Sequence, residues 1–249
     1  MKQESLRNNK PYIPSSDVNL DEVIEIPTYQ DQGFTRPKVL LLCPYRYYAY
    51  QFIDTMISLL PRKMAIFGKG KFLEEFSDDS GDADDEKQPK WKEFFPGNND
   101  DCFRMGISIS GKTFRMYTDF YNSDIVIASP LSLKQIEEKQ GWDYLSSIEV
   151  CIVYGMDMIM MQNIDHLFGI VENCNKTISK DRNTDFSRLR EYYLNDFQRY
   201  MRQTIFIGSI LSSNLLGLFH RSCYNTIVYL FIPYDYRADL RFDHLMKEL

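Results

Sequence analysis

Residues 148–154 of this 249-residue chain constrain its fold more than any other segment. The segment is largely apolar and β-branched, with Ser146 and Ser147 before it and Gly155 after it. An apolar run of this length between turn residues is typical of a strand that is buried on both faces of a parallel sheet. We therefore expect a sheet with helices on both faces.

Shorter apolar runs alternate with helical patterns along the rest of the chain. Further strands are predicted at residues 39–43, 125–128, 204–207 and 228–232. Helices are predicted at residues 48–60, 131–139, 163–173, 187–202 and 213–219. This alternation predicts an α/β fold with a parallel sheet and right-handed connections.

The chain is expected to hold one folded lobe with a polar segment at each end. Residues 1–32 are polar and proline-containing, which predicts a flexible N-terminal arm, and residues 33–232 form the lobe. An acidic stretch near residues 74–90 repels itself and is expected to be a disordered insertion. Residues 233–249 are expected to be a linker or the truncated start of a second lobe.

Composition narrows the classes of function. The net charge of -6 argues against a general polyanion binder, although local basic patches remain possible. The five cysteines and three histidines show no spacing typical of zinc sites, disulfide frameworks or catalytic triads, so no metal and no catalytic residue is predicted. Cys43 and Cys151 fall in predicted strands, where thiols are usually inert. No apolar run approaches ~20 residues, which predicts a soluble intracellular protein.

Residues 106–113, GISISGKT, match the phosphate-loop pattern G-x-x-x-x-G-K-[ST]. A cofactor site built on Gly106, Gly111, Lys112 and Thr113 is therefore a weak alternative. A phosphate loop follows a buried strand and opens a helix, whereas acidic residues precede this segment and residues 114–117 alternate like a strand. We expect the Gly111-Lys112 pair to be a hairpin turn and the chain to bind no cofactor.

Several long motifs together resemble one protein family. They are DQGFTRPKVLLL at 31–42, KFLEEF at 71–76, GNNDDCFRMG at 97–106, FYNSDIVIASPLSL at 120–133 and DFSRLREYYLNDFQRYMRQT at 185–204. Over residues 31–228 the chain resembles the U-three small nucleolar RNA-associated protein twenty-five family, also called digestive organ expansion factor. The resemblance implies a RecA-like (P-loop NTPase-like) first lobe of a degenerate DEAD-box helicase, and hence a fragment, an incomplete gene model or a shortened homologue.

The same resemblance implies that the lobe is not an enzyme. Tyr154 stands where related helicases place the acid that holds Mg²⁺, and only the second acid, Asp157, is kept. A phenol stays protonated at neutral pH and brings no charge to the cation. For Asp157, a role as a helix-capping or strand-end carboxylate is the favoured alternative to a metal role.

The resemblance also implies positions for contacts with RNA or a protein partner. Arg46, after Pro44 and Tyr45, and the Ser129-Pro130 turn stand where helicases contact the RNA backbone, and residues 208–210 stand at the coupling motif between lobes. For Arg46, an ion pair with a nearby surface acid is an equally open alternative.

Arginines of the predicted helix at 187–202 are further contact candidates, namely Arg188, Arg190, Arg199 and Arg202. In one interpretation they bind RNA phosphates or a protein partner. In the other they form a solvated helix face with Glu191 and Asp196 as intrahelical partners. The second interpretation is slightly favoured.

The resulting hypothesis is a non-catalytic, DEAD-box-like scaffold of the nucleolar small-subunit processome. Its expected partners are the ribosomal RNA precursor and proteins of the U3 snoRNP and processome, its expected role is processing toward 18S rRNA, and neither DNA nor a membrane is expected as a partner. One alternative is an RNA-dependent ATPase or helicase that uses residues 106–113. The other is a pure protein-interaction adaptor.

Overall fold

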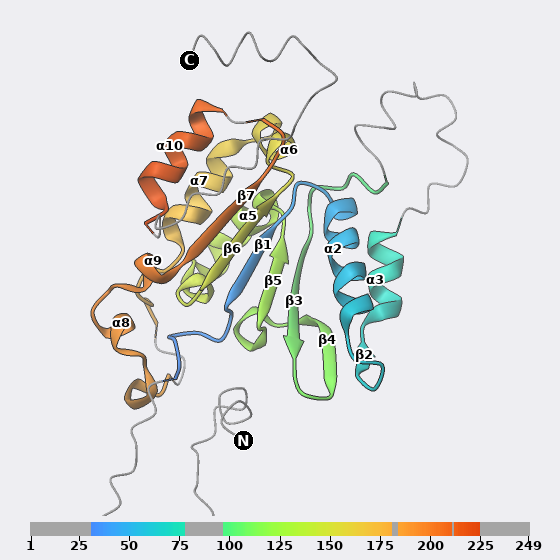
Figure 1. The fold of residues 1–249 in the computed structure, drawn as a ribbon, viewed down its shortest axis with the longest axis horizontal. Coiled ribbons are helices and arrows are strands. Elements are labelled where there is room, and N and C mark those ends of the chain that lie inside the picture. The colour runs from blue at the N-terminus through green and yellow to red at the C-terminus, as the bar shows by residue number, and fades with distance from the viewer. Residues whose placement is uncertain (1–30, 78–96, 181–183, 211, 225–249) are drawn as a thin grey trace, which may run out of the picture.

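A seven-stranded sheet forms the centre of the protein in the computed structural model, which describes residues 31–77, 97–180, 184–210 and 212–224. The strand order is β2-β4-β3-β5-β1-β6-β7 (Figure 1). The strands are β1 (Val39–Leu42), β2 (Ala65–Phe67), β3 (Arg104–Ile109), β4 (Thr113–Thr118), β5 (Ile125–Ala128), β6 (Val150–Tyr154) and β7 (Gln203–Ile207). The strands predicted around 39–43, 125–128, 148–154 and 204–207 are confirmed.

A single strand, β3, is reversed in this sheet, and the other six strands of the described residues run in one direction. β5, β1, β6 and β7 are mutually parallel, as predicted. β3 runs antiparallel to both β4 and β5, so the prediction of a wholly parallel sheet is wrong at this strand. The physical reason is the short connection between β3 and β4, because only antiparallel neighbours can be joined by a tight turn.

Helices cover both faces of the sheet. They are α2 (Arg46–Leu59), α3 (Lys69–Phe76), α5 (Pro130–Gln140), α6 (Met156–Met161), α7 (Ile164–Asn173), α8 (Glu191–Leu194), α9 (Gln198–Met201) and α10 (Ser213–Ser222). On one face, α2 and α3 bury Ile53 and Phe72 against Leu41 of β1. On the other face, α5, α7 and α10 pack against Leu40 and Leu42 (Figure 1). The predicted α/β architecture with helices on both faces is confirmed.

Asp31 and Gln32 belong to the folded body, so the predicted boundary of the N-terminal arm is wrong for these two residues. The guanidinium of Arg188 binds the Asp31 carboxylate through two hydrogen bonds of 3.1 and 2.8 Å. Gln32 forms an isolated parallel bridge with Leu189. Residues 1–30 lie outside the described part of the chain, as do residues 225–249 with the strand predicted at 228–232.

The single helix predicted at 187–202 is also wrong. A 3-10 turn at Phe186–Arg188 and the short helices α8 and α9 replace it. Leu189 and Tyr193 are buried against Phe34, and Asp196 has a left-handed φ of 57°, which interrupts the helix. Tertiary packing therefore overrides the local helical pattern in this segment.

The acidic segment begins inside a helix that the sequence did not predict. Glu74 and Glu75 lie in the last turn of α3, because Phe72 and Phe76 anchor this helix in the core. The rest of the predicted insertion, residues 78–90, lies outside the described residues, as do residues 91–96. Within the described segments, no helix is both long and apolar enough to span a bilayer.

Candidate functional site

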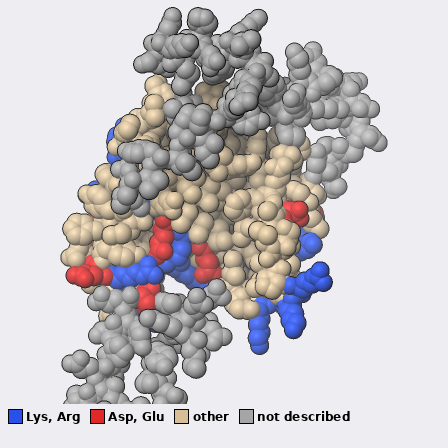
Figure 2. Space-filling view, viewed as in Figure 1, with Lys and Arg blue, Asp and Glu red and all other residues tan. Residues whose placement is uncertain are grey.

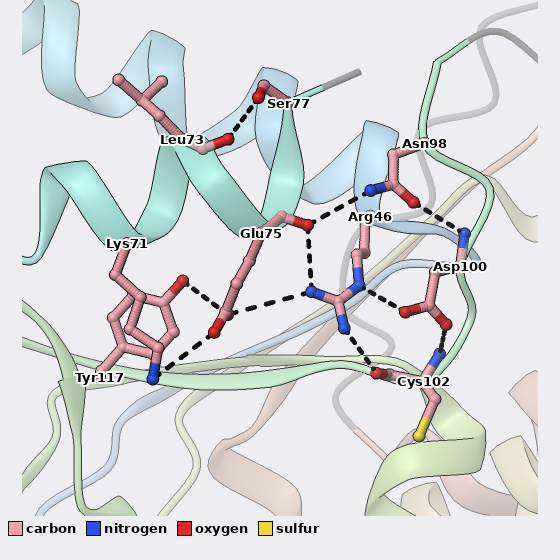
Figure 3. Close-up of polar contacts among 9 residues, drawn as sticks. All are labelled: Arg46, Lys71, Leu73, Glu75, Ser77, Asn98, Asp100, Cys102 and Tyr117. Carbon is pink, nitrogen blue, oxygen red and sulfur yellow. Dashed lines mark hydrogen bonds and ion pairs between the residues drawn. The ribbon is translucent and has the colours of Figure 1, made fainter. Parts of the chain in front are cut away.

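Arg46 is the first residue of α2 and lies at the carboxyl end of β1 (Figure 3). Its Nε donates to Asp100 Oδ2 at 2.8 Å, and its two Nη atoms donate to the carbonyl oxygens of Glu75 and Cys102 at 3.1 Å each. The guanidinium also lies 5.1 Å from the ring centroid of Phe76. Only 17% of the side chain is exposed. The predicted alternative, an ion pair with a nearby acid, is confirmed.

A second layer of contacts holds this network in place (Figure 3). Asn98 donates to the Glu75 carbonyl at 3.2 Å, while Lys71 lies 3.5 Å from the Glu75 carboxylate. The Tyr117 hydroxyl donates to the same carboxylate at 2.9 Å. Burial raises the pKa of Tyr117 well above its usual range, and the hydrogen bond to Glu75 acts in the same direction. The network therefore ties α2 to α3 and to the segment that enters β3, and it turns the donors of Arg46 inward.

Ser129 and Pro130 begin α5 rather than forming an exposed turn. Ser129 is 1% exposed, and its Oγ accepts a hydrogen bond of 3.1 Å from the backbone N–H of Ser132, which makes it the N-cap. Pro130 occupies the first helical position, where its missing N–H costs nothing, and it is buried. Contact of either residue with a phosphate remains a prediction, and it would require this segment to open.

Tyr154 ends β6 within an aromatic cluster. Its ring packs edge-on against Tyr48 at a centroid distance of 5.5 Å. Tyr48 in turn stacks on Tyr45 at 6.5 Å. Gly155 follows with a φ of +72°, and a Cβ atom there would lie 3.0 Å from the ring of Pro44. The carboxyl ends of β1 and β6 are therefore packed together by tyrosines.

Asp157 links the ends of β6 and β7. Its carboxylate accepts hydrogen bonds from the backbone N–H groups of Ser209 and Ile210 at 2.7 and 2.9 Å. Gly208 allows this approach, since an added Cβ would lie 2.9 Å from Met156 Cβ. The predicted role as a strand-end carboxylate is confirmed. No group of three or more potential metal ligands gathers anywhere in the described residues.

Residues 106–113 form a β-hairpin, as predicted. Gly106 lies in β3, Gly111 and Lys112 form the turn, and Thr113 begins β4. The backbone N–H of Ser110 donates to the Thr113 carbonyl at 2.8 Å, which closes the turn. A strand rather than a helix follows Thr113, so this segment lacks the helix N-terminus with which a phosphate loop binds phosphates.

Arg188 and Arg190 bind acids from distant parts of the chain. Arg188 pairs with Asp31. Arg190 lies 2.8 Å from Glu149, the residue just before β6, and Glu149 also pairs with Lys38 at 3.3 Å. The predicted intrahelical partners are wrong, because no continuous helix forms here. Figure 2 shows positive and negative side chains intermixed in the lower part of this face.

Arg202 is a buried cation, only 3% exposed. It donates to the carbonyl oxygens of Val171 and Ser222, to Asn175 Oδ1 and to Thr204 Oγ1, at distances of 2.8 to 3.1 Å. No carboxylate of the described segments pairs with it. The two carbonyls belong to the last turns of α7 and α10, where helix dipoles are negative and favour a cation. Arg202 thus holds two helix ends together.

Arg199 differs from the other predicted arginines because it is exposed. Its guanidinium lies 5.1 Å from the ring centroids of both Tyr200 and Tyr224, and it donates to the Tyr200 hydroxyl at 3.3 Å. It lines a cavity of about 700 Å³ together with Gln198 and other residues of α7, α9 and α10. Sequence reasoning missed this cavity and Gln198. The only available signal was the aromatic spacing around Arg199, namely Phe197, Tyr200 and Tyr224.

Cys43 and Cys151 are fully buried, as predicted. Burial raises the pKa of both thiols well above the usual range, so neither is a reactive nucleophile at neutral pH.

Comparison with known proteins identifies relatives of this chain. Residues 1–227 match the family model described as UTP25, NTP hydrolase-like domain. The chain is 41% identical over 182 residues to U3 small nucleolar RNA-associated protein 25 of Schizosaccharomyces japonicus, an alignment covering 71% of this chain and 28% of that protein. The human homologue is 36% identical over 208 residues, with 79% of this chain and 28% of that protein covered.

Among solved structures, one similar chain is the DEAD-box helicase Mss116 bound to ssRNA and UDP-BeF, with a TM-score of 0.27 and 14% sequence identity. The alignment covers 84% of this chain and 44% of the Mss116 chain. The chain spans little more than a quarter of the length of its named relatives. The seven-stranded α/β sheet agrees with the NTP hydrolase-like domain that the family model describes. The chain belongs to the UTP25 family, through its NTP hydrolase-like domain.

Proposed function

We propose that this chain is a non-catalytic lobe that acts as a scaffold in the small-subunit processome of the nucleolus. Its named relatives are U3 small nucleolar RNA-associated proteins, which supports a role with the U3 snoRNP in ribosome biogenesis. The observation that carries the non-catalytic part is the β-hairpin at residues 106–113, where the sequence has its phosphate-loop pattern.

Because residues 106–113 lack a phosphate-binding helix N-terminus, this segment would not couple nucleotide hydrolysis to movement of the lobe. It would therefore act by static docking to the ribosomal RNA precursor, to assembly proteins, or to both, and so support processing toward 18S rRNA. Tyr154 is consistent with this role, because its ring packs on Tyr48 at the strand end where a metal-binding acid would stand.

Calorimetric titration with Mg-ATP tests the non-catalytic part. We expect no micromolar binding to the 249-residue chain, and no difference for Lys112→Ala. Lys63→Ala is a matched control, because it removes an exposed lysine outside the hairpin. Micromolar binding that is lost in Lys112→Ala and kept in Lys63→Ala would instead establish the RNA-dependent ATPase alternative.

Crosslinking and immunoprecipitation of the tagged protein from cells tests the assembly role. We expect enrichment of the ribosomal RNA precursor, U3 snoRNA and small-subunit assembly factors over a mock purification. Recovery of neither RNA nor assembly factors would refute the scaffold proposal.

A pure protein-interaction adaptor is the second candidate function, favoured by one surface. Leu194 of α8, Phe197 just before α9 and Met201 of α9 are 54%, 53% and 52% exposed, which is unusual for large apolar side chains that lie close together in sequence. Assembly factors that co-purify without any crosslinked RNA would support this candidate.

A further inference from the structure

The cavity beside α9 is formed by the ends of three helices. Its lining includes Glu172 from α7, Lys176 and Thr177 after it, Gln198 and Arg199 of α9, and Arg221 of α10. Buried Arg202 holds the same helix ends together, so the cavity has a rigid base. A pre-formed cavity loses little conformational entropy when a ligand binds.

The lining carries an excess of positive charge in an acidic protein. Lys176, Arg199, Arg202 and Arg221 face two acids, Glu172 and Asp196, which gives a formal local charge of 4 − 2 = +2. Both acids are engaged, Glu172 with Arg221 at 2.7 Å and Asp196 with the Thr177 hydroxyl at 2.7 Å.

Arg199 and Lys176 carry charge that the described residues do not neutralise. The contacts of Arg199 are two tyrosine rings and one hydroxyl, and Lys176 donates to Asn173 Oδ1 at 2.7 Å. The rings orient the guanidinium of Arg199 and leave most of its donors for another acceptor. The ligand that suits these two cations is an anion.

Gln198 provides an independent indication of a ligand. It is 3% exposed, and its Nε2 donates to the Asn175 carbonyl at 3.0 Å. Its Oε1 is buried and has no hydrogen-bond partner among the described residues. A buried acceptor without a donor is unfavourable, so a ligand N–H or O–H that satisfies it gains affinity and specificity.

Aromatic rings next to the cavity supply stacking surfaces. Phe197, Tyr200 and Tyr224 are 53%, 42% and 44% exposed. Their rings form a continuous row, with centroid distances of 6.1 Å between Phe197 and Tyr200 and 5.2 Å between Tyr200 and Tyr224. Exposed aromatic rings beside cations are the means by which proteins bind unpaired bases together with their phosphates.

We propose that this cavity binds a short single-stranded segment of RNA, an inference that rests on the proposed function. Arg199 and Lys176 bind phosphates, bases stack on the exposed faces of Tyr200 and Tyr224, and Gln198 Oε1 accepts a hydrogen bond from a base amino group or a 2′-hydroxyl. An acidic peptide would satisfy the cations but would leave the aromatic row without matching partners.

Fluorescence anisotropy with a labelled oligouridine of about 12 nucleotides tests the site on the 249-residue chain. Arg199→Ala and Tyr224→Ala should each weaken binding by about tenfold, the loss of one stacking or charge contact. Arg199→Ala should also reduce the salt slope by about 0.7, the value for one phosphate contact with a single strand. Arg115→Ala is the matched control, since it removes an exposed arginine of β4 that lies 5.1 Å from the ring of Phe67 in β2, and it should change affinity less than twofold.

Three results would overturn the site. One is RNA affinity that Arg199→Ala and Arg115→Ala lower equally, which would indicate non-specific electrostatics. Another is displacement of the RNA by polyglutamate at equal charge concentration, which would indicate a docking site for an acidic protein segment. The third is no RNA binding at all, and if U3 snoRNA and assembly factors still co-purify from cells, the scaffold function survives without this site.

Discussion

Arg46 and Arg199 are both arginines beside aromatic rings, yet their surroundings make them opposites. Arg46 donates hydrogen bonds to Asp100 and to two backbone carbonyls, and only 17% of its side chain is exposed (Figure 3). Arg199 is exposed and contacts only tyrosines among the described residues. The comparison teaches that Arg46 uses its donors for contacts within the protein, whereas most donors of Arg199 have no acceptor among the described residues.

Arg202→Ala should give the largest effect, because this arginine forms the base of the Arg199 cavity. Its removal leaves the carbonyls of Val171 and Ser222 without their donor, and we expect the free energy of unfolding to fall by about 3–5 kcal/mol. Urea denaturation measures this. Arg221→Ala, which breaks an exposed ion pair with Glu172, should cost less than about 1 kcal/mol. Equal losses in the two variants would show that Arg202 is not a structural residue.

Arg46→Ala should rank second, with a loss of about 2–3 kcal/mol, since the Cys102 carbonyl loses its side-chain donor and Asp100 loses its cation. Lys71→Ala is the control, because Lys71 is 58% exposed in an i,i+4 pair and should contribute less than about 1 kcal/mol. If Arg46→Ala keeps its stability but loses affinity for RNA, the contrast between Arg46 and Arg199 is wrong.

Tyr117→Phe should have a smaller effect that depends on pH. It removes one hydrogen bond to Glu75, which costs about 1 kcal/mol at neutral pH. Because the folded pKa of Tyr117 is raised, its contribution is present below the unfolded pKa near 10 and is lost as pH rises above that value. The variant should therefore lose stability less steeply than the wild type between pH 9 and 11 in urea titrations. Parallel curves would contradict a raised pKa of Tyr117 in the folded protein.

Arg199→Ala should have the smallest effect on stability, below about 1 kcal/mol, because exposed cation–π contacts contribute little. Arg115→Ala is matched to it and should behave alike. Thermal unfolding of both variants measures this. A loss as large as that of Arg202→Ala would show that Arg199 stabilises the fold, and it would remove the basis for a cation in the cavity that is available to a ligand.

Local patterns were sufficient to predict much of the fold. The apolar runs at β1, β5, β6 and β7 were located correctly, because an apolar β-branched segment between turn residues has few other uses. The hairpin turn at Gly111 and Lys112 was predicted against a matching phosphate-loop pattern, because the strand-like alternation of residues 114–117 excludes the required helix. The helix predicted at residues 131–139 agrees closely with α5, which spans Pro130–Gln140.

Long-range contacts explain what could not be predicted. The segment 187–202 has a helical pattern, but Arg188 binds Asp31 across 157 residues of sequence and Leu189 packs with Phe34, so the helix breaks. The direction of β3 follows from its short connection to β4, but its pairing with β5 depends on how the sheet assembles. The partners of Arg188 and Leu189 lie too far away in the sequence to be visible in a local window.

The sequence by itself determined the strands β1, β5, β6 and β7, the hairpin at residues 106–113 and the family of the chain, because these depend on neighbouring residues and on long motifs. Only the tertiary structure decided which arginines bind partners within the protein and which keep hydrogen-bond donors for a ligand. Arg46, Arg188 and Arg202 are engaged by acids or carbonyls from distant segments, whereas Arg199 projects beside Tyr224 into an open cavity. Every arginine is charged at neutral pH, but whether its guanidinium can bind a ligand depends on the acceptors that the fold places beside it.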